Sequence, residues 1–303
     1  MAKTALILGA SGKIGTHAAR ALETRGWAIR RFDRKTGDMT HAAQGCALIV
    51  NGLNPPNYHD WAGIIPAITA QVIAAARASG ASVLIPGNVY HFGNRPGEWS
   101  EKTPPNPCSR KGQIRLDMEH TYRESGVQTI VLRAGDFIDP DHNGDTMSLV
   151  LLRGLKRGRI TAPGPTGIEH AYTYLPDWAE AAARLADMRA ELGRFEDIPF
   201  GDHCFTLETL KAGLERELGR PLSFARFPWW AMRLAGPFWE LARELREMRY
   251  LWQVPHRLST QRLRALLPDF EPTPLEEVIR AALPSDIHPD KPVAAGGAGH
   301  LMA

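Results

Sequence analysis

The sequence has few cysteines and little excess charge of either sign. Its 303 residues include three cysteines, Cys46, Cys108 and Cys204, an odd number at wide spacing that predicts neither a disulfide framework nor a metal site. Lysines and arginines number 36 and aspartates and glutamates 33, which gives a net charge of +3. Because binding to nucleic acid depends on concentrated positive charge, we expect no nucleic-acid partner.

Long apolar runs are also missing. None approaches the roughly 18 to 20 residues of a membrane span, and the chain begins directly with an apolar strand. A hydrophobic content of 44% with 23% charged residues is typical of a soluble globular protein. We therefore expect a cytoplasmic protein with no membrane partner.

A glycine-rich turn near the start is the most informative feature that the sequence does contain. The apolar residues 5–8 predict a buried strand, residues 13–24 a helix, and residues 27–33 a second strand that ends in an acid. Strand, tight turn, helix, strand and acid in this order predict a dinucleotide site, in which backbone amides bind the pyrophosphate and the carboxylate binds a ribose. The candidate cofactor-binding residues of this segment are Gly9, Ser11, Gly12, Lys13, Ile14, Gly15 and Asp33.

The spacing Gly9-x-x-Gly12-x-x-Gly15 resembles the short-chain dehydrogenase/reductase superfamily, in particular its extended and atypical branches of sugar-nucleotide epimerases, dehydratases and isoflavone-reductase-like enzymes. The resemblance implies an α/β fold with a doubly wound parallel sheet of the Rossmann type and a smaller, mostly helical C-terminal substrate lobe. It also implies a homodimer and a small-molecule substrate. The expected divisions are an NAD(P)-binding domain at 1–140 (completed by 168–201), a substrate lobe at 141–167 and 202–284, and a flexible tail at 285–303.

The residues around the acid leave the choice between NAD and NADP open. Asp33 favours NAD because a carboxylate accepts from the 2′-hydroxyl and repels a 2′-phosphate. Arg31, Arg34 and Lys35 can instead bind that phosphate. We prefer NAD and keep NADP as the alternative. The resemblance places Asp38 near the adenine amino group, and its other possible role is that of a turn residue.

Further strands are predicted at 47–52, 83–88 and 129–133, and the short connection after the second strand predicts that a third strand is short or missing. Ligands of open parallel sheets bind at the carboxyl ends of the strands, so the residues that follow these strands are candidates for contact. Cofactor contacts are expected from Asn51, Gly52, Leu53 and Pro86, and substrate contacts from Tyr58, Tyr90, His91, Asp136 and Phe137.

The catalytic positions depart from the pattern that the resemblance implies. The serine or threonine that holds the reacting oxygen falls on Asn88, and the Tyr-x-x-x-Lys pair falls on Lys111 and Arg115, so the tyrosine is missing. In one interpretation, catalysis has been lost and the protein senses NAD(P). In the other, the segment around Lys111 resembles the helix of isoflavone-reductase-like enzymes, in which a lysine is the acid/base.

Simple electrostatics is compatible with a catalytic lysine. Residues four apart share a helix face, so Lys111 and Arg115 are predicted to face the cofactor cleft together, and both are also candidates for cofactor contact. The permanent charge of Arg115 disfavours a second positive charge nearby, so we expect a depressed pKa for Lys111 that suits proton transfer near neutral pH. The simpler alternative is that both side chains only bind ribose and phosphate oxygens.

Residues 227–252 are rich in tryptophan and arginine. This segment can be a lid over an apolar substrate, a dimer surface, a membrane-surface helix, or a helical lobe whose aromatic face packs on the main domain. We favour the packed lobe because Glu240, Glu244 and Glu247 can pair with nearby arginines and would oppose anionic lipid.

The leading prediction is an NAD(P)-dependent oxidoreductase that moves hydride to or from a small carbonyl, carbinol or enone. In this prediction Lys111 is the acid/base, Arg115 binds ribose or tunes the lysine, and Asn88 holds the substrate oxygen. The alternative is an NAD-dependent sugar-nucleotide epimerase or dehydratase, which the missing Ser/Tyr/Lys set weakens. A second alternative is a non-catalytic NAD(P)-sensing regulatory protein.

Overall fold

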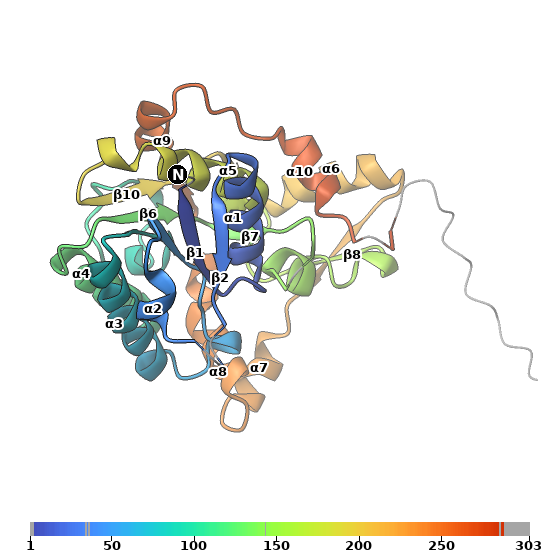
Figure 1. Cartoon of the computed structure of the whole chain (residues 1–303). Helices are drawn as coiled ribbons and strands as arrows, with labels where there is room; N and C mark the ends of the chain where they lie inside the picture. Colours follow the sequence, from blue (N-terminus) through green and yellow to red (C-terminus); the bar gives the residue numbers. More distant parts are fainter. Residues whose placement is uncertain (1–2, 34, 36, 143, 285, 288–303) are drawn as a thin grey trace, which may run out of the picture.

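A six-stranded parallel sheet forms the centre of the molecule (Figure 1). The computed structural model describes residues 3–33, 35, 37–142, 144–284 and 286–287; Arg34 and most of the expected tail at 285–303 lie outside the described residues. The strand order is β10-β6-β4-β3-β1-β2. The strands are β1 (Thr4–Leu8), β2 (Ala28–Arg31), β3 (Leu48–Asn51), β4 (Ser82–Gly87), β6 (Thr129–Arg133) and β10 (Phe195–Pro199).

The connection from β2 to β3 confirms the expectation about a third strand. Among its described residues there is no strand, and the short helix α2 (Met39–Ala43) makes the crossover. Asp38 caps this helix, since its carboxylate accepts hydrogen bonds from the backbone amides of Thr40 at 2.7 Å and His41 at 3.2 Å. The side chain therefore has the local role that a turn residue would have.

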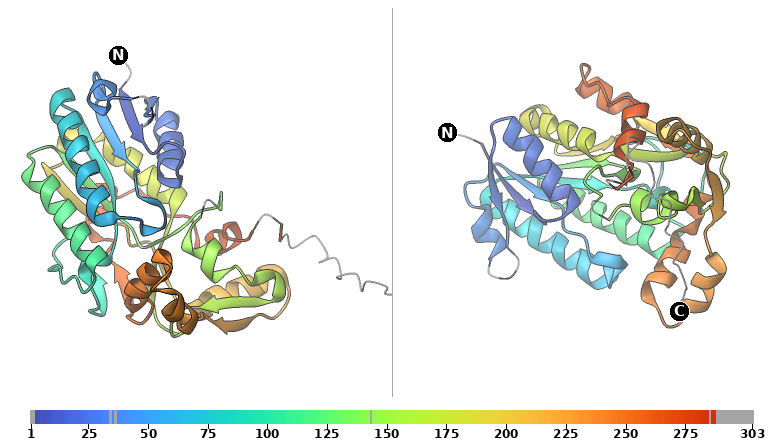
Figure 2. Two further views of the ribbon diagram at one scale, coloured as in Figure 1. Left: turned by 90° about the horizontal axis from the view of Figure 1, so that it is seen from below. Right: turned by 90° about the vertical axis from the view of Figure 1, so that its right-hand side faces the viewer.

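Two layers of helices cover the sheet, as the views in Figure 2 show. Side chains alternate across a strand, so Ile7 faces α1 (Lys13–Thr24) and α5 (Leu175–Asp187), whereas Leu6 and Leu8 face α3 (Trp61–Ser79) and α4 (Arg110–Glu124). Trp178 of α5 is completely buried, and its indole N–H donates to the carbonyl of Leu132 at 3.1 Å. The predicted doubly wound α/β class is confirmed.

Helix α3 corrects the statement that no apolar run approaches the length of a membrane span. By length and composition alone this helix could cross a membrane. Its residues Ile65, Val72, Ile73 and Ala76 are buried in the core beside the sheet. One such helix is weak evidence for a span, because a core helix of a Rossmann fold passes the same test.

The C-terminal lobe lies beyond the carboxyl ends of the strands (Figure 2). It contains more strand than the sequence predicted, in three small sheets with the orders β11-β9-β7, β12-β8 and β13-β5. The strands of these small sheets are β5 (Gly97–Trp99), β7 (Asp136–Ile138), β8 (Arg159–Ala162), β9 (His170–Tyr174), β11 (His203–Phe205), β12 (Ser223–Arg226) and β13 (His256–Leu258), so the N-terminal half contributes β5 and β7. The remaining helices are α6 (Leu207–Leu218), α7 (Trp229–Ala235), α8 (Glu240–Glu247), α9 (Gln261–Leu266) and α10 (Leu275–Ala281), of which α9 packs beside α5 on the main core. Six short turns are the other described elements: η1 (Pro56–Tyr58), η2 (Tyr90–Phe92), η3 (Met147–Leu151), η4 (Leu155–Arg157), η5 (Arg189–Glu191) and η6 (Met248–Trp252).

A buried cation connects the sheet to α4. Arg133, at the end of β6, has no exposed surface, and its Nη2 lies 2.7 Å from carboxylate oxygens of both Glu119 and Asp197. Its Nη1 donates to the carbonyl of Asn88 at 2.6 Å and lies 3.1 Å from Nδ1 of His91. One guanidinium thus joins α4, β10 and the loop after β4.

We predict that Arg133→Met destabilises the protein by about 3 to 5 kcal/mol, because it leaves two buried carboxylates without their cation. Urea unfolding at neutral pH measures this change. As a control, Arg20→Met removes a cation from an exposed pair with Asp141 and should change the free energy of unfolding by less than about 1 kcal/mol. Equal effects of the two substitutions would contradict the assigned role of Arg133.

Candidate functional site

The glycine turn brings the start of α1 close to the end of β3. Gly9 has a φ of +73°, and a Cβ there would lie 2.9 Å from the carbonyl oxygen of Gly52. A Cβ on Gly15 would lie 2.3 Å from the carbonyl oxygen of Gly9, so no side chain fits at either position. Gly12 is the N-cap of α1, and no side chain caps the helix. The amides of its first turn are therefore available to an anion.

A cavity of about 790 Å³ opens in front of this turn, at the carboxyl ends of the strands. Most of the site residues predicted from the sequence line this cavity, although they come from six separate segments. They are Gly12, Lys13, Ile14, Asn51, Gly52, Leu53, Tyr58, Pro86, Asn88, Tyr90, Arg115, Asp136 and Phe137. Gly9, Ser11, Gly15, Asp33, Asp38, His91 and Lys111 do not line it.

Lys13 lies at the mouth of the cavity. Its ammonium donates to the carbonyl of Gly144 at 2.7 Å, across the cleft from α1. Burial lowers the pKa of Lys13, and the carboxylates of Asp145, Asp139 and Asp136 oppose that shift. The side chain therefore bridges the two walls between which a dinucleotide would have to lie.

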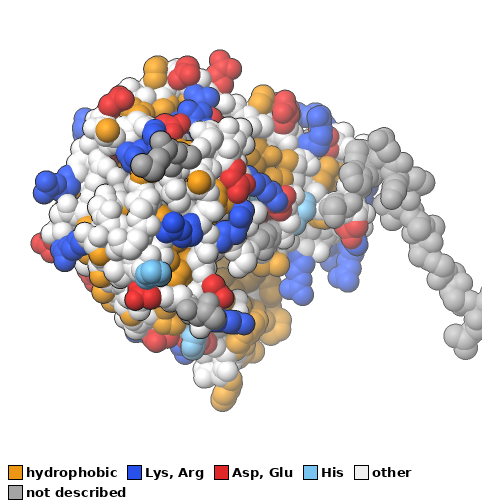
Figure 3. Space-filling model, viewed as in Figure 1, with side chains coloured by type: hydrophobic (Ala, Val, Ile, Leu, Met, Phe, Trp, Pro, Cys, Tyr) orange, Lys and Arg blue, Asp and Glu red, His pale blue; other side chains and the backbone are white. Residues whose placement is uncertain are grey.

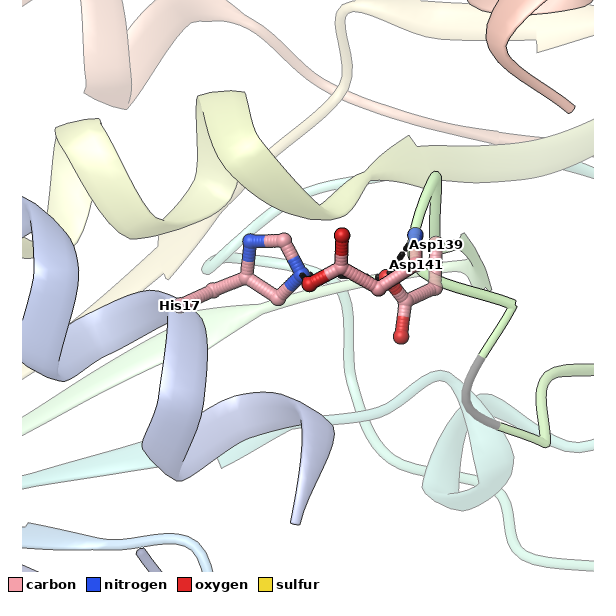
Figure 4. Close-up of side chains that lie close together, drawn as sticks. All are labelled: His17, Asp139 and Asp141. Atoms are coloured by element: carbon pink, nitrogen blue, oxygen red, sulfur yellow. Dashed lines mark hydrogen bonds and ion pairs between the residues drawn. The ribbon is translucent and has the colours of Figure 1, made fainter. Parts of the chain in front are cut away.

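A polar cluster fixes the loop that carries Gly144 (Figure 4). Nε2 of His17 on α1 lies 3.0 Å from a carboxylate oxygen of Asp139 and 3.6 Å from one of Asp141, and Arg20 lies 2.7 Å from Asp141. The ligand atoms of the first three residues are within 4.8 Å of one another, a spacing that metal ligands can have. Their hydrogen bonds and the nearby arginine give them a structural role, which is to tie α1 to this loop.

Lys111 differs from its predicted placement. Its side chain is 1% exposed, and its ammonium forms ion pairs with Glu244 and Glu247 of α8. It also lies 5.0 Å from the centre of the Tyr58 ring. The i, i+4 rule placed Lys111 on the correct side of α4, but the sequence could not show that α8 covers this turn. The prediction that Lys111 faces the cleft is therefore wrong.

Arg115, one turn further along α4, does face the cleft. Its Nη2 donates to the side-chain oxygen of Asn54 at 2.8 Å, and its guanidinium lies 4.6 Å from the centre of the Trp61 ring. Nε of Arg115 is buried and has no hydrogen-bond partner among the described residues. Burial lowers the pKa of Arg115, and the nearby phenols and Glu119 oppose this.

Two phenols and a carboxylate occupy the inner end of the cavity. The hydroxyls of Tyr58 and Tyr90 are 3.2 Å apart, and the side chain of Asn88 accepts a hydrogen bond from the amide of Tyr90 at 3.0 Å. Asp136 lies 2.9 Å from Nε2 of His170, another residue of the lining. This group was expected only in part, because the sequence shows no pattern that pairs these side chains.

His91 does not contact the cleft, which corrects its assignment as a substrate residue. It is 5% exposed and accepts a hydrogen bond from Arg133. Burial and the charge of Arg133 lower the pKa of His91 to about 2, so the ring is neutral. Its role is in the core.

The Trp/Arg-rich segment forms one wall of the cavity and also a free surface. Phe227, Met232, Trp239, Leu241, Leu245 and Leu251 line the cavity. Trp230 is 71% exposed and Phe238 is 95% exposed, so the expectation that the aromatic face packs on the main domain holds only for part of it. Figure 3 shows hydrophobic side chains gathered at the end of the molecule where Figure 1 places α7 and α8. A helical periodicity in the sequence identifies this face but not what it covers.

We predict that Lys111→Met loosens α8, because two partly buried carboxylates lose their cation. Amide hydrogen exchange over 240–247 should become faster by an amount equivalent to about 3 kcal/mol. Adding Glu244→Gln and Glu247→Gln should restore much of the protection. In the control, Lys211→Met removes a surface pair with Glu215 on α6 and should leave α8 unchanged. Unaltered exchange in Lys111→Met would refute the anchoring role.

Two buried histidines predict a loss of stability in mild acid. The pKa of His91 is lowered to about 2 and, chiefly by burial, that of His256 to about 3, whereas unfolded histidines have a pKa of about 6.5. Stability is therefore full above about pH 6.5 and is lost as the pH falls from there toward 3, because the unfolded chain binds more protons. Two histidines give a slope of up to about 2.7 kcal/mol per pH unit.

Urea unfolding between pH 7 and pH 5 measures that slope. His256→Gln should reduce it by about one proton, whereas His120→Gln, on the exposed face of α4, should not change it. A slope that is the same in all three proteins would be inconsistent with a neutral, buried His256.

The fold recurs in solved enzymes, although the sequences are distant. No protein-family model matches the chain, and no curated protein matches it. UDP-glucuronic acid 4-epimerase from Bacillus cereus, solved with UDP-glucuronic acid and NAD, is 15% identical with a TM-score of 0.73, over 92% of this chain and 97% of that chain. Triphenylmethane reductase from Citrobacter sp., solved with NADP(H), is 16% identical with a TM-score of 0.65, over 93% of this chain and 100% of that chain. The chain therefore shares the fold of these two proteins, a Rossmann-type α/β fold, as the sequence predicted.

Proposed function

We propose that the chain is an NAD(P)-dependent oxidoreductase that binds its dinucleotide in the cleft between the sheet and the C-terminal lobe. The observation that carries this proposal is the start of α1, where a glycine turn without room for side chains leads into an uncapped helix at the edge of the cavity. The structural neighbours solved with NAD or NADP(H) support it.

The residues present fit such a cofactor. The amides of the first turn of α1 and the side chain of Lys13 would hold the pyrophosphate, and Asn51, Gly52, Leu53 and Pro86 would border the nicotinamide half. Arg115, which the resemblance aligns with the lysine of the Tyr-x-x-x-Lys pair, would bind the ribose. When bound, the nicotinamide supplies the capacity to accept or give a hydride.

We infer a preference for NAD from the surroundings of Asp33. Arg31, which could bind a 2′-phosphate, lies 3.1 Å from Glu23 instead. Asp33 accepts a hydrogen bond from the amide of Lys35 at 2.9 Å, which fixes the carboxylate at the end of β2. A fixed carboxylate there favours ribose hydroxyls over a phosphate. NADP remains the alternative, with Arg34 as its candidate ligand.

We propose a small carbonyl, carbinol or enone as the substrate. The wall contributed by α7 and α8 is apolar, and Asp136 places a carboxylate in the same space. The missing Ser/Tyr/Lys set weakens the alternative of a sugar-nucleotide epimerase or dehydratase. Because Lys111 is held by two glutamates, we do not assign it the role of acid/base. We further propose a cytoplasmic homodimer that uses α3 and α4.

We predict that Gly12→Ala weakens NADH binding at least tenfold with little change in stability. The backbone of Gly12, φ −86° and ψ 165°, accepts alanine, but a Cβ would lie 3.3 Å from the carbonyl oxygen of Gly9 beside the exposed amides. NADH fluorescence titration and thermal unfolding measure the two effects. Gly167→Ala, in a loop where a Cβ makes ordinary contacts, is the matched control.

Turnover separates the remaining functions. Cofactor absorbance should change with aldehydes, ketones or enones for an oxidoreductase, and nucleotide sugars should be converted without net absorbance change for an epimerase. Binding of dinucleotide without conversion of any of these carbonyl compounds or nucleotide sugars would favour the NAD(P)-sensing protein. Absence of dinucleotide binding would reject all three.

A further inference from the structure

We propose that the hydroxyls of Tyr58 and Tyr90 together form a hydrogen-bond donor for a carbonyl oxygen, in place of the phenol that is missing from α4. This inference rests on the proposed function, because it names the part of the substrate that the cleft would bind. The two hydroxyls come from two loops that are separated in the chain by α3 and β4.

The two phenols meet because their strands are neighbours. Tyr58 ends η1, which follows β3, and Tyr90 begins η2, which follows β4, and β3 and β4 pair in the sheet. Their oxygens are 3.2 Å apart and both residues line the cavity. The pair contains two hydroxyl protons, and the hydrogen bond between them uses one. The other is left to donate, and the internal bond makes it a stronger donor.

Both rings are fixed from several sides. The Tyr58 ring lies 5.0 Å from the ammonium of Lys111 and 5.1 Å from the Trp61 ring, and Trp61 stacks against Tyr90 at 6.4 Å. The carbonyl of Tyr90 accepts a hydrogen bond from the hydroxyl of Tyr250 at 3.2 Å. A donor held in this way needs little reorganisation when a ligand binds.

The backbone that places Tyr58 is strained. Asn57 has a φ of 54° and Tyr58 a φ of 61°, the left-handed region that bulky residues rarely adopt. Asp60, with a φ of 39°, has a local reason for its conformation, because it caps α3. Asn57 and Tyr58 cap nothing. Nδ1 of the next residue, His59, lies 2.8 Å from a carboxylate oxygen of Glu240 on α8.

Burial keeps the pair in the donating form. Burial, more than any other factor, raises the pKa of Tyr58 and raises that of Tyr90 well above its usual value, and Asp136 adds to both shifts while Arg115 opposes them. The charge of Glu244 also raises the pKa of Tyr58, and the ammonium of Lys111 lies over the Tyr58 ring. Both phenols are thus protonated at neutral pH.

The surroundings define the class of ligand. Asp136 and Arg115 line the same space and act on the phenols with opposite charges, so a neutral ligand is favoured there, and Leu241, Leu245 and Leu251 provide an apolar wall in the same cavity. A neutral carbonyl compound with an apolar or aryl body combines an acceptor for the phenols with surface for the wall.

The probe for this site is 4-(dimethylamino)cinnamaldehyde, whose absorption moves to longer wavelength when its carbonyl oxygen accepts a hydrogen bond. With oxidised dinucleotide present, so that the probe is not reduced, we expect a shift to longer wavelength on binding to the wild-type protein. Tyr58→Phe and Tyr90→Phe should each keep part of the shift, because the remaining phenol still has a proton. The double variant should lose the shift and bind about tenfold more weakly. Tyr174→Phe, outside the cavity lining, should match the wild type.

A shift that persists in the double variant would overturn the proposal, as would a wild-type protein that leaves the probe unbound or unshifted. Thermal unfolding of each variant distinguishes loss of the donor from loss of the fold. NADH titration is independent of the probe. NADH binding without a probe shift rejects the phenol pair alone, and a probe shift without NADH binding rejects the cofactor proposal alone.

Discussion

The ion pairs of Lys111 with Glu244 and Glu247 determine the shape of the cleft. They join the first turn of α4, which belongs to the nucleotide-binding half, to α8 in the C-terminal lobe. A nearly fully buried ammonium is stable only when its charge is matched, so the two carboxylates must stay with it. Because Glu244 and Glu247 belong to α8, this contact also places Leu241 and Leu245 of the same helix along the cavity. The wall of the cleft therefore depends on a charge at its outer edge.

The same arrangement separates two residues that lie four apart on one helix. Lys111 is covered by α8, whereas Arg115 reaches the cavity and binds Asn54. Lys111, which the resemblance placed where a catalytic phenol was expected, thus belongs to the scaffold. The phenols that do line the cleft, Tyr58 and Tyr90, come from the ends of β3 and β4.

Arg133 provides the second fixed point, at the carboxyl end of β6. It holds the carbonyl of Asn88 and the ring of His91 as well as two carboxylates. The loop after β4 therefore starts from a rigid base, and Tyr90 follows within it. Two buried cations therefore hold α4, Lys111 in its first turn and Arg133 through Glu119 further along the helix.

The sequence by itself determined the sheet, the glycine turn and the missing third strand. These features rest on local signals: apolar strands, glycines where no Cβ fits, and a connection too short for another strand. It also identified most of the cavity lining, because strand ends in a parallel sheet meet at one edge. Only the tertiary structure decided that Lys111 faces α8, that His91 lies beside Arg133 and that Tyr58 meets Tyr90. Each of these depends on a partner many residues away in the chain, and periodicity places a side chain on a face without showing what covers that face.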